Sequence, residues 1–106
     1  ADYSYFFLFS TGPNAPPANV AGRNASSTSI LVSWEQVPAL NQNGVILRYT
    51  VTYTKFPGGS SQTKNVTASA NQTTLIGLNK YTNYSITVFA STSKGGGNQS
   101  TPIVVI

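Results

Sequence analysis

The chain lacks several residue types on which enzyme chemistry and covalent cross-linking commonly depend. Cysteine, histidine and methionine are absent from its 106 residues, and Asp2 and Glu35 are its two acids. Without cysteine, neither disulfides nor thiolate metal sites can form. A lone Ser or Thr nucleophile would have no base to activate it, because no histidine is present and the two acids are far apart in sequence. We therefore predict a non-enzymatic domain with no catalytic residues, no cofactor and no bound metal.

Positive charge is scarce as well, and it is not clustered. The net charge of +4 comes from six cations spread along the whole chain: Arg23, Arg48, Lys55, Lys64, Lys80 and Lys94. A nucleic-acid site would need a basic cluster interleaved with aromatic residues, so no nucleic-acid partner is expected. No apolar run approaches the roughly 18 residues that span a bilayer, and no direct membrane insertion by this segment is expected.

Alternation of apolar and polar residues is what the chain does have, with no sustained helical periodicity. Ile30-x-Val32-x-Trp34 and Leu47-x-Tyr49-x-Val51-x-Tyr53 each predict a strand with one buried face, and Arg48, Thr50, Thr52 and Thr54 would line the opposite face of the second. Breakers rich in Pro and Gly separate these runs. The predicted strands cover residues 18–22, 30–34, 47–53, 73–78, 84–90 and 103–106. Many short strands at regular spacing predict an all-β sandwich or small barrel.

The order of these motifs resembles the fibronectin type III family. The resemblance runs from about Pro16 to Val105 and rests on Pro16-Pro17 with Val20, "STSILVSWE", "GVILRYTVTY", Leu78-x-x-x-Thr82-x-Tyr84 and "YSITVFA". It implies a seven-stranded antiparallel β-sandwich of immunoglobulin-like type, with three strands packed on four. It also implies a domain over residues 15–106, with residues 1–14 as an N-terminal extension or the remnant of a preceding module. One departure is the turn before Tyr84, where Lys80 and Tyr81 replace the usual Pro and Gly.

The resemblance and the alternation together define the expected core. Trp34 would lie at its centre, and the Tyr84 hydroxyl would hydrogen-bond to upstream backbone in a tyrosine corner. The expected core residues are Trp34, Tyr49, Val51, Leu78, Tyr84, Ile86 and Val88.

N-glycosylation is the covalent chemistry that the sequence indicates. Five Asn-x-Ser/Thr sequons occur, against about 2.5 expected by chance from this composition, which favours a secreted chain. Asn83 lies directly before the core residue Tyr84, and the alternation of a strand would point their side chains to opposite faces. The candidate sites are Asn24, Asn65, Asn71, Asn83 and Asn98.

A partner surface is predicted on the outward face of two strands that lie side by side in this family. Its candidate residues are Arg48, Thr50, Thr52 and Phe89, with Phe89 as the aromatic anchor. The alternative contact is the loop over residues 91–100, which lacks the Arg-Gly-Asp tripeptide through which family members bind integrins.

The expected function is that of an extracellular module, on a cell surface or secreted, within a larger adhesion, receptor or matrix protein. Its work would be spacing and protein–protein contact, with protein partners and the neighbouring modules of the same chain. An accessory spacer of a secreted multidomain enzyme is the alternative. A cytokine-receptor-like module is disfavoured, since the cysteines and a Trp-Ser-x-Trp-Ser run are missing.

Overall fold

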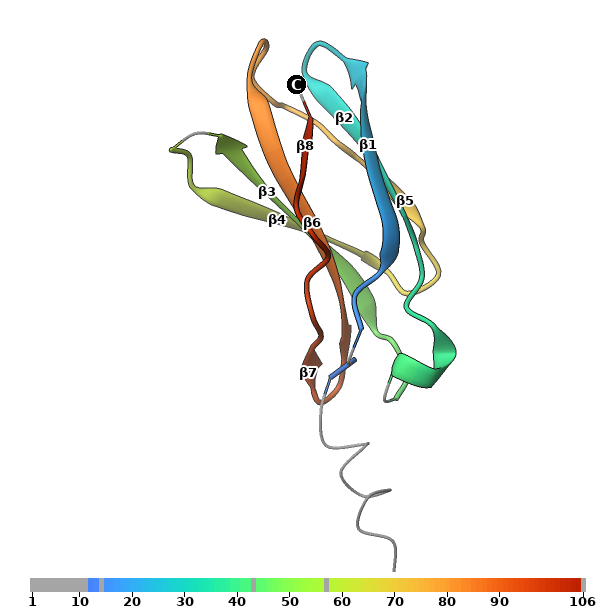
Figure 1. The fold of residues 1–106 in the computed structure, drawn as a ribbon. Helices are drawn as coiled ribbons and strands as arrows, with labels where there is room; N and C mark the ends of the chain where they lie inside the picture. The colour runs from blue at the N-terminus through green and yellow to red at the C-terminus, as the bar shows by residue number, and fades with distance from the viewer. Residues whose placement is uncertain (1–11, 14, 43, 57, 106) are drawn as a thin grey trace, which may run out of the picture.

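Two antiparallel β-sheets form the molecule (Figure 1). The structure is a computed structural model that describes residues 12–13, 15–42, 44–56 and 58–105, so the predicted extension over residues 1–14 lies almost wholly outside the described residues. The first sheet has the order β1-β2-β5, and the second has the order β4-β3-β6-β7, with β8 also paired to β6. The strands are β1 (Ala18–Ser26), β2 (Ser29–Glu35), β3 (Arg48–Phe56), β4 (Ser61–Thr67), β5 (Gln72–Leu75), β6 (Asn83–Thr92), β7 (Gly95–Gly96) and β8 (Ile103–Val105).

The predicted all-β, three-on-four sandwich is confirmed, with the last strand broken into β7 and β8. Both pieces pair with the same side of β6, β7 at Ser91 and Thr92 and β8 from Tyr84 to Ile86. Between them the Ser100 N–H donates to the Val88 carbonyl at 2.9 Å, and the Ser100 hydroxyl accepts from the Val88 N–H at 2.9 Å. The edge of the sheet is therefore continuous in its hydrogen bonds although its backbone is irregular.

Several strand boundaries differ from the sequence-based expectation, and two strands, β4 and β7, lie outside the predicted ranges. The fifth strand ends at Leu75 rather than residue 78, and the first extends to Ser26 rather than residue 22. The strand β4 has no counterpart among the predicted ranges, because it contains one large apolar residue, Val66, and most of its residues are exposed. An edge strand whose side chains are solvent-exposed on both faces has little alternation of apolar and polar residues, so its sequence does not predict a strand.

The core fills the space between the sheets, and Val32, Val51, Ile86 and Val88 have no exposed area. Trp34 is 4% exposed, and its ring centroid lies 5.7 Å from that of Tyr49 with the planes inclined at 42°. Burial of aromatic and branched side chains from both sheets supplies the main stabilising term of such a sandwich. The buried apolar residues are Ile30, Val32, Trp34, Val37, Ile46, Tyr49, Val51, Leu75, Leu78, Tyr84, Ile86, Val88, Ala90 and Val105.

The position of Leu47 differs from the one that the alternation before β3 predicts. The alternation places it inside, but it is about half exposed, because Ile46, two residues before β3, occupies the buried position. The Leu47 N–H still donates to the Ser91 carbonyl at 2.7 Å, so the segment stays attached to β6. The alternation therefore slips by one residue at the entry to β3.

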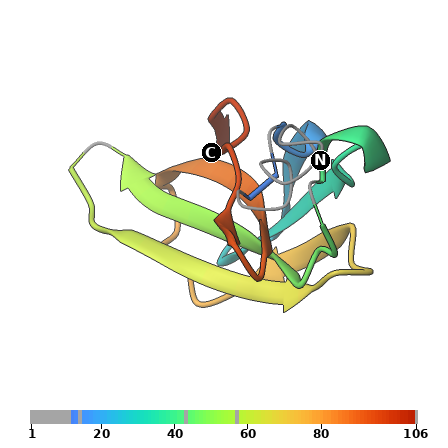
Figure 2. The ribbon, with the colours of Figure 1, turned by 90° about the horizontal axis from the view of Figure 1, so that it is seen from below.

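The sandwich has two ends, which we call the N-terminal pole, where the first strand begins, and the C-terminal pole, where the last strand ends. At the N-terminal pole β1 begins, and the β2–β3, β4–β5 and β6–β7 connections lie there; at the C-terminal pole β8 ends, beside the β1–β2 turn and the β5–β6 connection (Figure 1). Viewed along the long axis, β3 and β4 form one margin, while β1, β2 and the 3-10 turn η1 (Ala39–Asn41) lie toward the other (Figure 2).

A tyrosine anchors one crossover between the sheets at each pole. The Tyr49 hydroxyl accepts a hydrogen bond from the Val37 N–H at 3.1 Å, which holds the β2–β3 connection. The Tyr84 hydroxyl accepts from the Asn79 N–H at 2.9 Å and holds the β5–β6 connection, as the tyrosine-corner prediction requires. Burial raises the pKa of the Tyr49 hydroxyl, and the hydrogen bond from Val37 partly opposes that rise.

Candidate interaction surfaces

The outward face of β3 and β6 is where the sequence predicted a partner. The register pairs Thr50 with Phe89 and Thr52 with Thr87, so the predicted residues do lie side by side. Thr50, however, is only 5% exposed, and its hydroxyl donates to the Asn65 side-chain oxygen at 2.7 Å. Little of the Thr50 side chain is therefore available to a partner, because the neighbouring strand β4 lies beside it and satisfies its hydroxyl.

Phe89 is also less available than its outward position suggests. It is partly buried, and a Cβ atom at Gly96 would lie 3.1 Å from the Phe89 ring. The absence of a side chain at Gly96 lets β7 pass close beside that ring. Arg48 stays exposed and Thr52 partly exposed, so the middle of this face presents one cation and polar groups, and Phe56 at the end of β3 is its strongly exposed large apolar side chain on these two strands.

The strongly exposed large apolar side chains of the described residues lie away from the middle of this face, toward the two poles. Three belong to the β2–β3 connection at the N-terminal pole, where Leu40 is 94% and Val45 79% exposed, with Leu47 beside them in sequence. The others lie at the C-terminal pole, on the last residue of β3, in the β5–β6 connection and on β8: Phe56, Ile76, Tyr81 and Val104. Sequence reasoning missed this division, because exposure at a strand end cannot be read from alternation.

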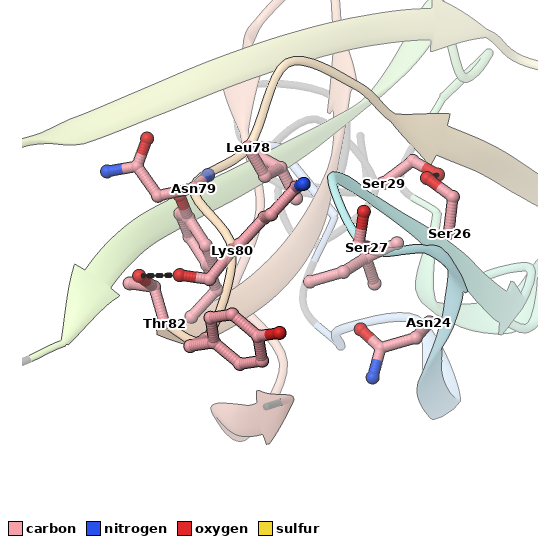
Figure 3. A pocket seen from close by; sticks show the side chains of 11 residues that line it. Asn24, Ser26, Ser27, Ser29, Leu78, Asn79, Lys80 and Thr82 are labelled. Carbon is pink, nitrogen blue, oxygen red and sulfur yellow. Dashed lines mark hydrogen bonds between the residues drawn. The ribbon is translucent and has the colours of Figure 1, made fainter.

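A groove of about 270 Å³ opens at the C-terminal pole between the β1–β2 turn and the β5–β6 connection (Figure 3). Ser27 and Asn24 lie across it from Lys80 and Thr82, and the Thr82 hydroxyl donates to the Lys80 carbonyl at 2.9 Å. Its apolar lining comes from the buried residues Ile30, Leu78 and Tyr84. The two sides are joined by a hydrogen bond from the Leu78 N–H to the Thr28 carbonyl at 2.9 Å.

Tyr81 stands at the rim of this groove in an unusual conformation. Its side chain is completely exposed, and its φ of 55° lies in the left-handed region that favours glycine. A non-glycine residue there costs roughly 1–2 kcal/mol. The strain agrees with the departure noted in the sequence, where Lys80-Tyr81 replaces the Pro and Gly usual for this turn.

The five sequon asparagines are distributed over both poles and one edge. Asn24 and Asn83 lie at the C-terminal pole, Asn71 and Asn98 at the N-terminal pole, and Asn65 on the edge strand β4. All are exposed except Asn83, which is partly buried. Asn83 and Ser85 project outward while Tyr84 is buried between them, so this tripeptide presents an attachment point without disturbing the core.

Neither a metal centre nor a membrane span is found within the described ranges. No three or more His, Cys, Asp or Glu side chains lie there in a group that could hold a metal ion. That part of the chain also has no helix with the length and apolar character needed to cross a membrane.

Comparison with known proteins assigns the fold to a family. The family model described as "Fibronectin type III domain" matches residues 15–106. The chain belongs to the fibronectin type III family. As a module of this family it superposes on the chicken CNTN1 FN1–FN3 crystal structure with a TM-score of 0.80 at 29% identity, covering 89% of this chain and 32% of that one.

The similar curated proteins are far longer than this module. It is 42% identical to chicken protein sidekick-1 over 87% of this chain and 4% of the relative. It is 41% identical to zebrafish receptor-type tyrosine-protein phosphatase F over 88% of this chain and 5% of the relative. The cell adhesion molecule Dscam1 of Drosophila melanogaster is 40% identical over 86% of this chain and 5% of its own length. The module is thus homologous to single repeats within cell-surface adhesion proteins and receptor phosphatases.

Proposed function

We propose that this module is an extracellular spacer and protein–protein contact unit within a larger cell-surface adhesion or receptor protein, and that it carries no catalysis of its own. The observation that supports this most is the position of the exposed apolar side chains, which lie toward the poles and not in the middle of the sheet faces. Exposed apolar clusters on a domain commonly mark the surfaces where it meets another protein unit.

The poles are the surfaces that a neighbouring module would meet. Because β1 begins at one pole and β8 ends at the other, modules joined through these strands would lie end to end. Leu40 and Val45 would face the unit before β1, and Ile76 and Tyr81 the unit after β8. Interfaces between domains of one chain are modest in area and partly polar, which suits three or four apolar side chains set among Ser, Thr and Lys.

An accessory spacer within an enzyme-bearing protein is the second candidate, and the likeness to a receptor-type tyrosine-protein phosphatase favours it. Under both candidates the mechanical role of this module is the same. They differ in the identity of the other domains, which the sequence of the whole parent protein decides.

Hydrogen exchange tests the proposed contacts at the two poles directly. The module is compared alone and in a protein that also contains the flanking domains of its parent. We expect slower amide exchange over residues 39–47 and 76–82 when the neighbours are present, with unchanged exchange across the outward face of β3. The variants Val45→Lys and Tyr81→Lys should each abolish the protection at their own pole, whereas the matched face variant Thr52→Lys should leave both poles protected. Equal exchange with and without the neighbours would refute the proposal.

A further inference from the structure

An exposed aromatic ring lies directly opposite one of the five sequon asparagines. Phe56, the last residue of β3, pairs with Asn83, the first residue of β6, and their side chains share the outward face of the sheet. Residues directly opposite in an antiparallel pair have Cβ atoms about 4.5–5.5 Å apart. Phe56 is 53% exposed, which leaves an apolar ring in water beside the asparagine.

The surroundings of Asn83 differ from those of the other four sequon asparagines, all of which are described. Asn24 pairs with Ile30, which is buried, and Asn65 pairs with Thr50, whose hydroxyl holds the Asn65 side-chain oxygen. Asn71 and Asn98 lie outside the strands. The apolar surface next to Asn83 extends further, because Val104 is more than half exposed and pairs with Ser85, the third residue of the same sequon.

We propose that Asn83 carries an N-linked glycan whose first sugar covers the ring of Phe56. This rests on the proposed extracellular location, because the donor, an oligosaccharide linked to a polyisoprenyl diphosphate, is met on the secretory route. In the transfer, the Asn83 side-chain nitrogen forms a bond to C1 of the first N-acetylglucosamine. The bond from C1 to the diphosphate oxygen breaks, the amide nitrogen loses one proton, and the polyisoprenyl diphosphate leaves.

The contact follows from the chemistry of the two surfaces. One face of a pyranose ring presents C–H groups, which pack on an aromatic ring through dispersion and weak C–H contacts. Covering Phe56 also removes apolar area from water, which is favourable. The Asn83 side chain makes no hydrogen bond to another described residue that would hold its amide away from the ring. The glycan would thus cap apolar surface that the fold leaves open at the end of β3.

Glycopeptide mass spectrometry of the protein secreted from mammalian cells tests the modification. We expect glycan on Asn83. If Asn83 is unmodified while other sequons carry glycan, the proposal is overturned and the extracellular role stands. If no sequon is modified in the secreted protein, the proposal is overturned and the extracellular role loses its support from the sequons as well.

A thermodynamic cycle tests the contact with Phe56. Wild type, Ser85→Ala, Phe56→Thr and the double variant are secreted, trimmed to one N-acetylglucosamine per site and melted; Ser85→Ala removes the glycan while leaving Asn83 in place. Losing the glycan should lower the Tm by about 2–5 °C more when Phe56 is present than in the Phe56→Thr background, a shift that one modest contact produces in a domain of this size.

Two controls make that cycle specific. The same four proteins made in bacteria, without glycans, should show no such coupling. Asn71→Gln removes a sequon at an exposed position that lies outside the strands, together with any glycan that it carries, and its effect on the Tm should not depend on Phe56. The proposed contact is overturned if the Tm effect of Ser85→Ala does not depend on Phe56 in the glycosylated proteins. It is also overturned if the dependence is equally large in the proteins made in bacteria.

Discussion

Removal of a single hydroxyl from either anchoring tyrosine should destabilise the module, and the two losses should differ in a predictable direction. Tyr49→Phe deprives the Val37 N–H of its acceptor, and Tyr84→Phe does the same to the Asn79 N–H. Both phenylalanines keep the ring and its packing, so each substitution mainly tests one hydrogen bond.

The surroundings of the two N–H donors set the magnitudes. Val37 is 2% exposed, so its N–H would be left without a partner and away from water, which costs about 2–3 kcal/mol. Asn79 lies in an exposed connection, where water can replace the lost acceptor, and about 1 kcal/mol is expected. Tyr49→Phe should therefore be the more damaging change. Because the two bonds lie at opposite poles, the double variant should lose the sum of both effects within about 0.5 kcal/mol.

Urea unfolding followed by the fluorescence of Trp34, the one tryptophan of the chain, measures these losses. With an m-value of about 1 kcal/mol/M, the midpoint should fall by about 1 M for Tyr84→Phe and by about 2–3 M for Tyr49→Phe. An unchanged midpoint for Tyr84→Phe would show that its ring alone matters. A larger loss for Tyr84→Phe than for Tyr49→Phe would refute the argument from solvent access.

Three further predictions concern the core, the strained turn and alkaline pH. In the same urea assay, Trp34→Ala should lower the free energy of unfolding by about 3–5 kcal/mol. Trp34→Phe should lower it by only about 1–2 kcal/mol, because the buried indole N–H has no hydrogen-bond partner among the described residues and its removal breaks no hydrogen bond. Tyr81→Gly should raise the Tm by about 4–8 °C by relieving the left-handed backbone; a lower Tm would mean that the exposed ring contributes packing. Burial keeps the pKa of the Tyr49 hydroxyl in the folded state above its ordinary 10.0, so above pH 10 the unfolded state releases this proton first. The free energy of unfolding should therefore fall as the pH rises above 10, and Tyr49→Phe should flatten the decline in Tm over that range relative to wild type.

Much of the fold could be predicted because alternation reports burial directly. The strands that line the core repeat apolar residues at every second position, as in Tyr84, Ile86 and Val88, and the family motifs order these strands into two sheets. The strand β4 escaped prediction for the converse reason: its polar residues face water on an edge, and its place is determined by pairing with β3 across seven residue pairs. Pairing of this kind depends on a distant segment and leaves no local pattern.

The candidate partner face illustrates a different limit. Alternation correctly places Thr50 outward, but it describes one strand at a time and does not include what a neighbouring strand adds. Asn65 reaches over from β4 to Thr50, and β7 runs close to Phe89 because Gly96 has no side chain. An outward side chain in the middle of a sheet is thus flanked by neighbours on both sides, whereas one at a strand end has a neighbour on fewer sides.

The same geometry explains why the apolar surface collects at the poles. Phe56 and Val104 face outward like Thr50, yet they lie near the ends of their strands, where fewer neighbours cover them. Leu40, Val45, Ile76 and Tyr81 lie in connections, where no ladder flanks them at all. Apolar residues at such positions lower solubility unless something covers them, since exposed apolar area favours association. A module that keeps the middle of its sheet faces polar and its ends apolar is therefore suited to the proposed end-to-end contact.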